Sequence, residues 1–205
     1  MLQPIADAVK IINKEVVIPT KANKMIYLLA PVIALIASLT NWAIMPLNFI
    51  AIENYTNSSV SALLWFCISS FGVYAIILSG WSSNSKYAFR GARRSSAQMI
   101  SYEVLFSLVI LTIMVMAGSS NLGDFIIQQQ SVWFVIPCLP LAMIFFIAAL
   151  AETNRTPFDL PEAEAEIVAG YNIEYSSMAF ALFFRAEYGN MFALSFVTSA
   201  FFIGG

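Results

Sequence analysis

The sequence contains no histidine and only two cysteines, Cys67 and Cys138, each of which lies inside an apolar run. The commonest protein ligands of zinc, haem iron and iron–sulfur clusters are therefore missing, and two isolated cysteines make no disulfide framework. We expect the chain to bind no metal and no cofactor of its own. Any redox centre then belongs to another polypeptide.

Charged residues are also scarce, at 11% of 205 residues, against about 25% in a soluble domain. Apolar residues make up 60%, which is more than a chain of this length can bury in its own interior. The excess must face lipid or other subunits, which excludes a soluble enzyme and a disordered linker. The net charge of -2 argues against a nucleic-acid partner, because nucleic-acid-binding domains are usually basic.

Long apolar segments predict an all-α, polytopic membrane helix bundle of about five transmembrane helices. A helix that spans a bilayer needs about 20 mostly apolar residues. The predicted spans are Met25–Leu47, Val60–Trp81, Met99–Gly118, Val132–Ala151 and Tyr175–Ile203. Prolines inside these spans are tolerated where neighbouring helices satisfy the freed backbone groups.

Basic residues lie before the first predicted span and in the loops after the second and fourth. They are Lys10, Lys14, Lys21, Lys24, Lys86, Arg90, Arg93, Arg94 and Arg155. The loops near residues 50–59 and 119–131 contain none. Since lysine and arginine favour the inner face of a membrane, this alternation predicts five spans with the N-terminus inside.

The segment before the first span has an amphipathic pattern. Apolar residues recur at spacings of three and four from Leu2 to Val16, while Gln3 and Asp7 lie on another face. Such a helix lies in the plane of the membrane interface. We therefore divide the chain into an interfacial segment, 1–24, and a membrane helix bundle, 25–205, which includes an acidic inner loop, 152–174.

Three charged residues fall inside predicted spans. A carboxylate there is costly and usually faces the bundle interior, a water cavity or a partner. Glu103 lies about one turn inside the third span, so it is either a proton-accepting group or a solvated residue at the interface. Arg185 and Glu187, two residues apart, point in different directions on a helix, and each needs a partner of its own on a neighbouring helix or subunit. A structural interhelix ion pair is the alternative to a functional role for these two residues.

The loop after the fourth span is unusually acidic for an inner loop. It combines one arginine, Arg155, with six carboxylates: Glu152, Asp159, Glu162, Glu164, Glu166 and Glu174. Composition alone leaves two interpretations open. The loop is a solvated surface, or it is an acidic cluster that binds protons, cations or a basic partner.

Residues Ala151–Tyr175 closely resemble the acidic inner loop of a known family. This family is subunit 1 of respiratory complex I, the proton-pumping NADH:ubiquinone oxidoreductase, together with its bacterial counterpart. Gly80–Arg94 and Leu2–Lys10 resemble two further signatures of that family, in the same order. The three segments are distributed along the chain from residue 2 to residue 175.

The resemblance implies a membrane-arm subunit that forms part of the quinone-access tunnel. It also implies an acidic path that couples NADH-driven quinone reduction to proton translocation. By this resemblance the residues of the tunnel and junction loop are Gln3, Asp7, Arg90, Arg93, Arg94, Arg155, Asp159, Glu162, Glu164 and Glu166. Those of the proton path are Glu103, Glu152 and Glu187.

The same resemblance implies ubiquinone as substrate, with FMN, Fe–S clusters and NADH on partner subunits. The expected partners are lipid, other membrane-arm subunits, and peripheral-arm subunits at the quinone site. The expected location is the mitochondrial inner membrane with the N-terminus on the matrix side, or alternatively a bacterial plasma membrane.

Two features depart from the family pattern. Family members usually have one span before the first signature and two more after the point where this sequence ends, so we expect a middle fragment of a split subunit completed by separate chains. Arg185 also occupies a position where the family has an apolar residue. The alternative function is a membrane ion-translocating subunit of an antiporter or an energy-converting hydrogenase, without quinone chemistry.

Overall fold

The computed structural model describes residues 3–45, 59–158 and 170–204, except for the side chains at positions 4, 5, 7 and 8. Every regular element in this part of the chain is a helix, which confirms the all-α membrane bundle. In chain order the helices are α1 (Gln3–Asn13), α2 (Lys24–Ile44), α3 (Ser61–Ser82), α4 (Lys86–Ala117), α5 (Leu122–Gln128), α6 (Leu139–Glu152) and α7 (Ser177–Phe202).

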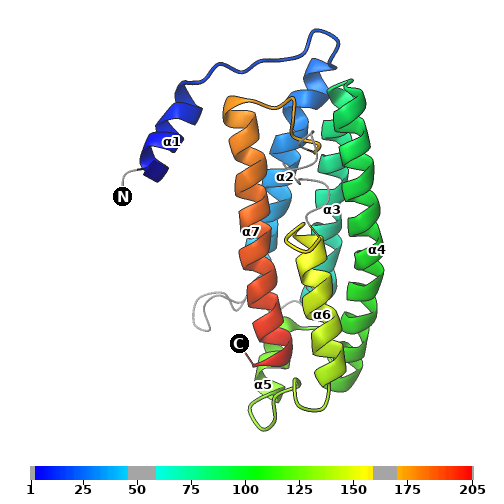
Figure 1. The fold of residues 1–205 in the computed structure, drawn as a ribbon. Coiled ribbons are helices and arrows are strands. Elements are labelled where there is room, and N and C mark those ends of the chain that lie inside the picture. The colour runs from blue at the N-terminus through cyan, green and yellow to red at the C-terminus, as the bar shows by residue number, and fades with distance from the viewer. Residues whose placement is uncertain (1–2, 46–58, 159–169, 205) are drawn as a thin grey trace.

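The bundle consists of α2, α3, α4, α6 and α7, which correspond to the five predicted spans (Figure 1). Among the described helices, α2, α3 and α4 are long and apolar enough to cross a membrane. Helix α6 is apolar but has only 14 residues, and α7 has 26 residues that include Arg185 and Glu187. Large apolar side chains cover the outside of the bundle, as at Val115, which is 81% exposed.

The fourth span begins later than predicted, at Leu139 rather than Val132. Pro137 disfavours a helical conformation at the residue before it, and the backbone N–H of Ile136 instead donates to Trp133 in a turn. Pro140 fits the first turn of α6, where no backbone N–H is needed. The prolines therefore shorten this helix at its N-terminal end.

Other helix boundaries also differ from the prediction. Helix α4 begins at Lys86, well before the predicted start of the third span, and its 32 residues extend about 48 Å. Helix α1 ends at Asn13, so only part of 1–24 is helical. Helix α5 was not predicted; its N-cap Asn121 accepts a hydrogen bond from the Gly123 N–H, which favours a short helix in an otherwise polar loop.

The bundle contains two apolar clusters. One packs aromatic rings from α4, α6 and α7, including Phe106, Phe145 and Phe201. The other packs Tyr27, Phe183 and small residues of α2, α3 and α4. Polar residues of α2, α3, α4, α6 and α7 lie along the boundary between the two clusters.

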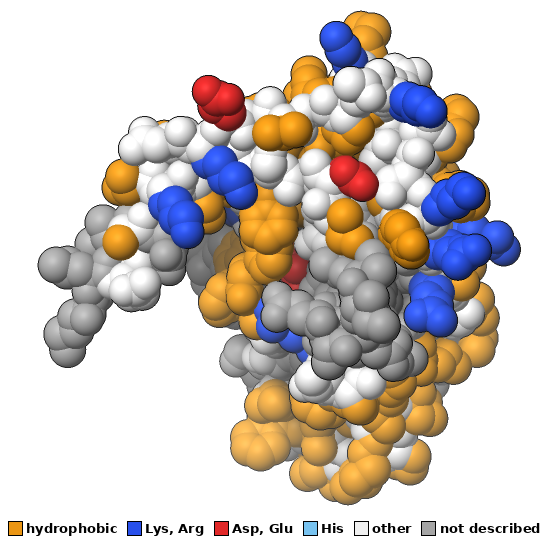
Figure 2. Space-filling view, turned by 45° about the horizontal axis from the view of Figure 1, so that its top comes forward, with side chains coloured by type: hydrophobic (Ala, Val, Ile, Leu, Met, Phe, Trp, Pro, Cys, Tyr) orange, Lys and Arg blue, Asp and Glu red, His pale blue; other side chains and the backbone are white. Residues whose placement is uncertain are grey.

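The basic side chains gather at one end of the molecule. Figure 2 shows lysine and arginine along the end that Figure 1 draws at the top, and apolar side chains over the flank below it. This end contains the starts of α2, α4 and α7, and the segment from α1 to α2. The two ends of the bundle thus differ in charge, as the loop pattern predicts.

Helices α3 and α4 approach closely at Gly80. A Cβ added to Gly80 would overlap the Cβ of Ala92 and lie 2.9 Å from the Ala88 carbonyl oxygen.

We predict that Gly80→Ala destabilises the bundle by about 1–3 kcal/mol, because the backbones must separate. Thermal denaturation of the detergent-extracted native assembly measures this. Gly72→Ala is the matched control on the same helix, since nothing lies within 4 Å of its added Cβ; equal melting of the two variants would contradict the prediction.

Candidate functional site

Helix α6 ends at Glu152, partway along the bundle rather than at its surface (Figure 1). The last carbonyls of a helix have no partner within that helix and need donors from elsewhere. Backbone N–H groups of residues 153–155 supply some of them, and the Gln98 amide of α4 supplies another. Its Nε2 donates to the carbonyl oxygens of Ala151 at 2.9 Å and Phe158 at 3.1 Å, and to Asn154 Oδ1 at 3.3 Å. Gln98 therefore holds the end of α6, and the residues that follow it, inside the bundle.

The residues just before α7 are held by a pair of tyrosines. The Tyr27 hydroxyl donates to the Glu174 carbonyl oxygen at 2.6 Å, and the Tyr175 hydroxyl donates to the Tyr27 carbonyl oxygen at 3.2 Å. The two rings stack with centroids 4.1 Å apart. Both ends of the acidic loop are thus anchored to the bundle.

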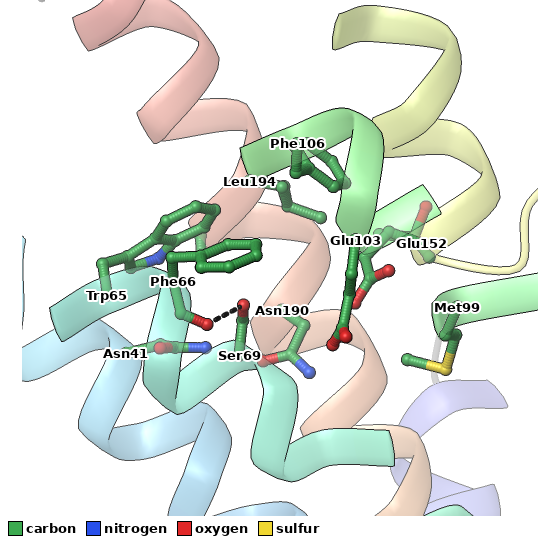
Figure 3. A pocket seen from close by; sticks show the side chains of 12 residues that line it. Asn41, Trp65, Phe66, Ser69, Met99, Glu103, Phe106, Glu152, Asn190 and Leu194 are labelled. Atoms are coloured by element: carbon green, nitrogen blue, oxygen red, sulfur yellow. Dashed lines mark hydrogen bonds between the residues drawn. The ribbon is translucent and has the colours of Figure 1, made fainter. Parts of the chain in front are cut away.

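Glu103 and Glu152 face a common cavity of about 30 Å³ at the centre of the bundle (Figure 3). Its walls come from α2, α3, α4 and α7, together with the end of α6. The apolar part of the lining includes Trp65, Phe66 and Phe106, and the polar part includes Asn41, Ser69 and Asn190. We call this space the Glu103 cavity. Glu103 therefore faces a space between the helices of the bundle.

Several polar atoms that line the Glu103 cavity are buried without a hydrogen-bond partner among the described residues. They are Asn41 Oδ1, Trp65 Nε1, Glu103 Oε1, Glu152 Oε2 and Asn190 Oδ1. Buried polar atoms are rarely left unsatisfied unless water or an ion serves them. A volume of about 30 Å³ has room for about two water molecules, and the lining supplies the polar partners that such water requires.

A second cavity of about 50 Å³ adjoins the first, and we call it the Glu187 cavity. The two cavities share Met99, Glu152, Thr153 and Asn190 in their walls. Glu187 faces this second space and forms an ion pair with Arg155, whose Nη2 lies 3.5 Å from Glu187 Oε1. The Arg155 guanidinium also lies 5.0 Å from the centroid of the Tyr188 ring.

These contacts link three carboxylates from three helices in one series. Glu103 on α4 and Glu152 on α6 share one cavity, and Glu152 and Glu187 on α7 share the next. Carboxylates joined by water-sized polar spaces can pass protons from one to the next, which is the usual role of acidic residues inside membrane bundles. The partner of Glu187 is Arg155 of the same chain, so at this position a neighbouring subunit is not required.

The other predicted site residues lie elsewhere. Gln3 is exposed on α1, and the side chains of Arg90, Arg93 and Arg94 are exposed on the first turns of α4, away from both cavities. Asp159, Glu162, Glu164, Glu166 and the side chain of Asp7 lie outside the described residues. Gly91 of α4 packs on the end of the loop, because a Cβ added there would lie 2.8 Å from the Gly170 carbonyl carbon. The fold thus brings together two of the three resembling segments, Gly80–Arg94 and Ala151–Tyr175.

A groove of about 310 Å³ lies between α1 and the start of α7. Its lining combines Lys10 and Lys14 with the apolar side chains of Ile11 and Phe180. The Ser177 hydroxyl donates to the Ile11 carbonyl oxygen at 3.1 Å, which ties the two helices together. The groove can accept a molecule with an apolar body and a polar head.

Sequence reasoning missed Gln98, Asn41 and Asn190. The available signal was the same one that drew attention to Glu103, namely a hydrogen-bonding side chain inside an apolar span. Asn41 and Asn190 are uncharged, however, and Gln98 lies just before the predicted third span, so a search for intramembrane charges passes over all three.

The fold and the site define a class: a polytopic membrane helix bundle with a path of carboxylates through its centre. The profile of the family described as NADH dehydrogenase matches residues 1–205. The chain belongs to the NADH dehydrogenase family, which confirms the resemblance of its three signature segments.

Similar proteins come from algae, plants and bacteria. The chain is 50% identical to NADH-ubiquinone oxidoreductase chain 1 of Chondrus crispus, over all 205 of its residues and 62% of that protein. It is 52% identical to the protein of the same name from Triticum aestivum, with the same coverage. It is 55% identical to an NADH-quinone oxidoreductase subunit of Rickettsia rickettsii (strain Iowa), over all of this chain and 60% of that protein. The chain thus spans about 60% of the length of these relatives.

We predict that Gln98→Leu loosens the end of α6. The substitution removes the amide donor to the Phe158 carbonyl oxygen, at a cost of about 1–3 kcal/mol. The Ala151 carbonyl oxygen loses the same donor but keeps the backbone N–H groups of Thr153 and Asn154. Hydrogen exchange of backbone amides in residues 153–158 of the native assembly should then be at least about tenfold faster. Gln130→Leu makes the same chemical change at an exposed position and should leave this exchange unaltered. Equal protection of residues 153–158 in both variants would show that Gln98 does not hold the segment.

Proposed function

We propose that this chain is a membrane-arm subunit of an NADH:ubiquinone reductase of the proton-translocating type, respiratory complex I. In this role it forms part of the quinone-access tunnel and of the acidic path that couples quinone reduction to proton translocation. Its relatives are named as parts of NADH-ubiquinone and NADH-quinone oxidoreductases, and these names support the assignment to this enzyme. They do not support the alternative of an antiporter or hydrogenase subunit without quinone chemistry.

The observation that carries the proposal is the position of Glu152 between two adjoining cavities. Glu152 shares one with Glu103 and the other with Glu187, and it is the first residue of the acidic loop. Reduction of a quinone near that loop changes the local charge, and Glu152 is the first carboxylate of the path that this change affects. Protons then redistribute among Glu187, Glu152 and Glu103 through water in the cavities. Asn190 lines both spaces and orients this water at the point where they meet.

The quinone enters, in this proposal, through the groove between α1 and α7. Segment 1–24 lies at the membrane interface, with Gln3 and Asp7 beside the entrance. The apolar side chains of Ile11 and Phe180 face the isoprenoid tail, and Lys10 and Lys14 lie at the level of the lipid headgroups. Ubiquinone is the substrate, and the redox groups FMN, Fe–S clusters and NADH are held by partner subunits.

The basic end of the bundle supports an orientation and a set of partners. Lysine and arginine at this end favour the matrix side of the mitochondrial inner membrane, or the cytoplasmic side of a bacterial plasma membrane. Arg90, Arg93 and Arg94 are exposed there on α4. They offer a basic surface to the peripheral-arm subunits. The junction loop, which contains Arg155, Asp159, Glu162, Glu164 and Glu166, contacts the same subunits in this proposal. Other membrane-arm subunits and lipid cover the apolar flanks.

We predict that Glu152→Gln in the native complex breaks the acidic path. The amide keeps the shape of the side chain but cannot carry a proton, so proton translocation coupled to NADH:quinone reduction should fall by about tenfold or more. Proton uptake in sealed vesicles, measured beside NADH oxidation by ferricyanide, separates this loss from a failure of electron input. Glu103→Gln should give the same pattern.

Asp124→Asn is the matched control for these variants. Asp124 is a carboxylate in the first turn of α5, at the opposite end of the bundle from the basic residues. Its replacement should leave proton translocation unchanged. Normal translocation in both glutamine variants, with normally assembled complex, would refute the proposed path.

A further inference from the structure

The side chain of Arg185 lies on the outside of the bundle, in a groove between α2 and α7. The groove has a volume of about 350 Å³ and is lined mainly by apolar and aromatic residues: Leu35, Leu39, Trp42, Tyr188 and Phe192, with Ser38 and Gly189 as its small residues. Leu39 and Phe192 are 54% and 59% exposed. A permanent positive charge therefore lies among side chains that are otherwise suited to contact with lipid or with another helix.

Contacts between α2 and α7 fix the depth of Arg185. Gly189 packs on Ser38, and its carbonyl oxygen accepts a hydrogen bond from Trp42 Nε1 at 3.0 Å. Arg185 lies one turn before Gly189, which places it level with Leu35, near the middle of the 21-residue α2. Since α2 is about 32 Å long and a hydrocarbon core is about 30 Å thick, Arg185 is about 15 Å from either membrane surface.

A cation at this depth needs a counter-charge. Arginine near the centre of a spanning helix is strongly unfavourable unless it is paired or reaches the interface. Arg185 forms no ion pair with the residues that the structure describes. The nearest acid along the chain, Glu187, points about 200° away around α7 and is paired with Arg155.

We propose that this groove is the docking site of a membrane-spanning helix from another chain, and that this helix carries an aspartate or glutamate that pairs with Arg185. The exposed lining of the groove consists of large apolar and aromatic side chains, such as Leu39 and Phe192, which suit contact with an apolar partner helix. A carboxylate at mid-membrane level matches Arg185 in charge and in depth. A lipid phosphate matches the charge but lies at the surface, beyond the reach of an arginine side chain about 15 Å away.

The inference requires only that α2 and α7 cross a membrane. It does not depend on the identity of the quinone or on proton transfer through Glu152. Loss of this contact and failure of the proposed path are therefore separate results.

The experiment uses Arg185→Lys in the native complex, treated with dicyclohexylcarbodiimide, a reagent that enters membranes and activates buried carboxylates. The introduced amine attacks the activated carboxyl, an amide bond forms, and the reagent leaves as the urea. We expect mass spectrometry to find a cross-link from position 185 to an aspartate or glutamate in a spanning helix of another chain. Leu108→Lys is the control, because Leu108 is 57% exposed on α4 and lines none of the described cavities; it should give no such product.

Arg185→Leu provides a second measurement that needs no chemistry. It leaves the partner's carboxylate unpaired inside the membrane, so the amount of assembled complex on a native gel should fall at least about tenfold. Three results would overturn the proposal: no cross-link to protein, a cross-link to a residue of this same chain, or normal assembly of Arg185→Leu. Retention of phospholipid by the wild type, without a protein cross-link, would assign the groove to a lipid headgroup instead.

Discussion

The hydrogen bonds from Gln98 to the end of α6 are the constraint on which the rest of the site depends. A helix that stops inside a membrane bundle exposes carbonyl groups where no bulk water can reach them. The Gln98 amide donates to the carbonyl oxygens of Ala151 and Phe158 there, beside the backbone N–H groups of the residues that follow α6. Together these donors let α6 end at mid-depth. Glu152 is consequently held beside Glu103 of α4, and Arg155, whose side chain is 37% exposed, reaches Glu187 of α7.

Burial of these charges shapes the surrounding core. The two apolar clusters of the bundle meet along the polar residues that line the Glu103 and Glu187 cavities. Trp65 and Phe106 shield the Glu103 cavity from one side, and Met99 forms part of both walls. In the proposed mechanism, water in these two cavities connects the three carboxylates. Arg185, by contrast, lies outside this enclosure and depends on what covers the α2–α7 groove.

Much of the fold could be predicted from the sequence, because hydropathy and the placement of lysine and arginine act over single segments. These local signals indicated the five bundle helices and the charge difference between the two ends. They also placed Glu103 and Glu187 inside spans. The late start of α6 depends on where Pro137 and Pro140 lie relative to its first turn. Helix α5 depends on Asn121, which caps it in a loop. Such details are decided by a few atoms rather than by composition.

The site was less accessible to sequence reasoning, because it is assembled from tertiary contacts. Nothing in the spacing of Arg155 and Glu187, 32 positions apart, indicates their ion pair. The roles of Asn41, Asn190 and Gln98 likewise follow only from the packing of helices that are distant in sequence. The family resemblance indicated which carboxylates belong together, and the structure supplies the cavities that connect Glu103, Glu152 and Glu187.

In the proposed mechanism, Glu152 exchanges a proton with its neighbours when quinone is reduced. Redox-induced infrared difference spectroscopy of the native complex measures this directly, because a protonated carboxyl has a carbonyl stretch separate from the amide bands. We predict a carboxyl signal on quinone reduction in the wild type that is lost in Glu152→Gln and retained in Asp124→Asn. An identical signal in wild type and Glu152→Gln, with quinone reduced equally in both, would contradict this mechanism.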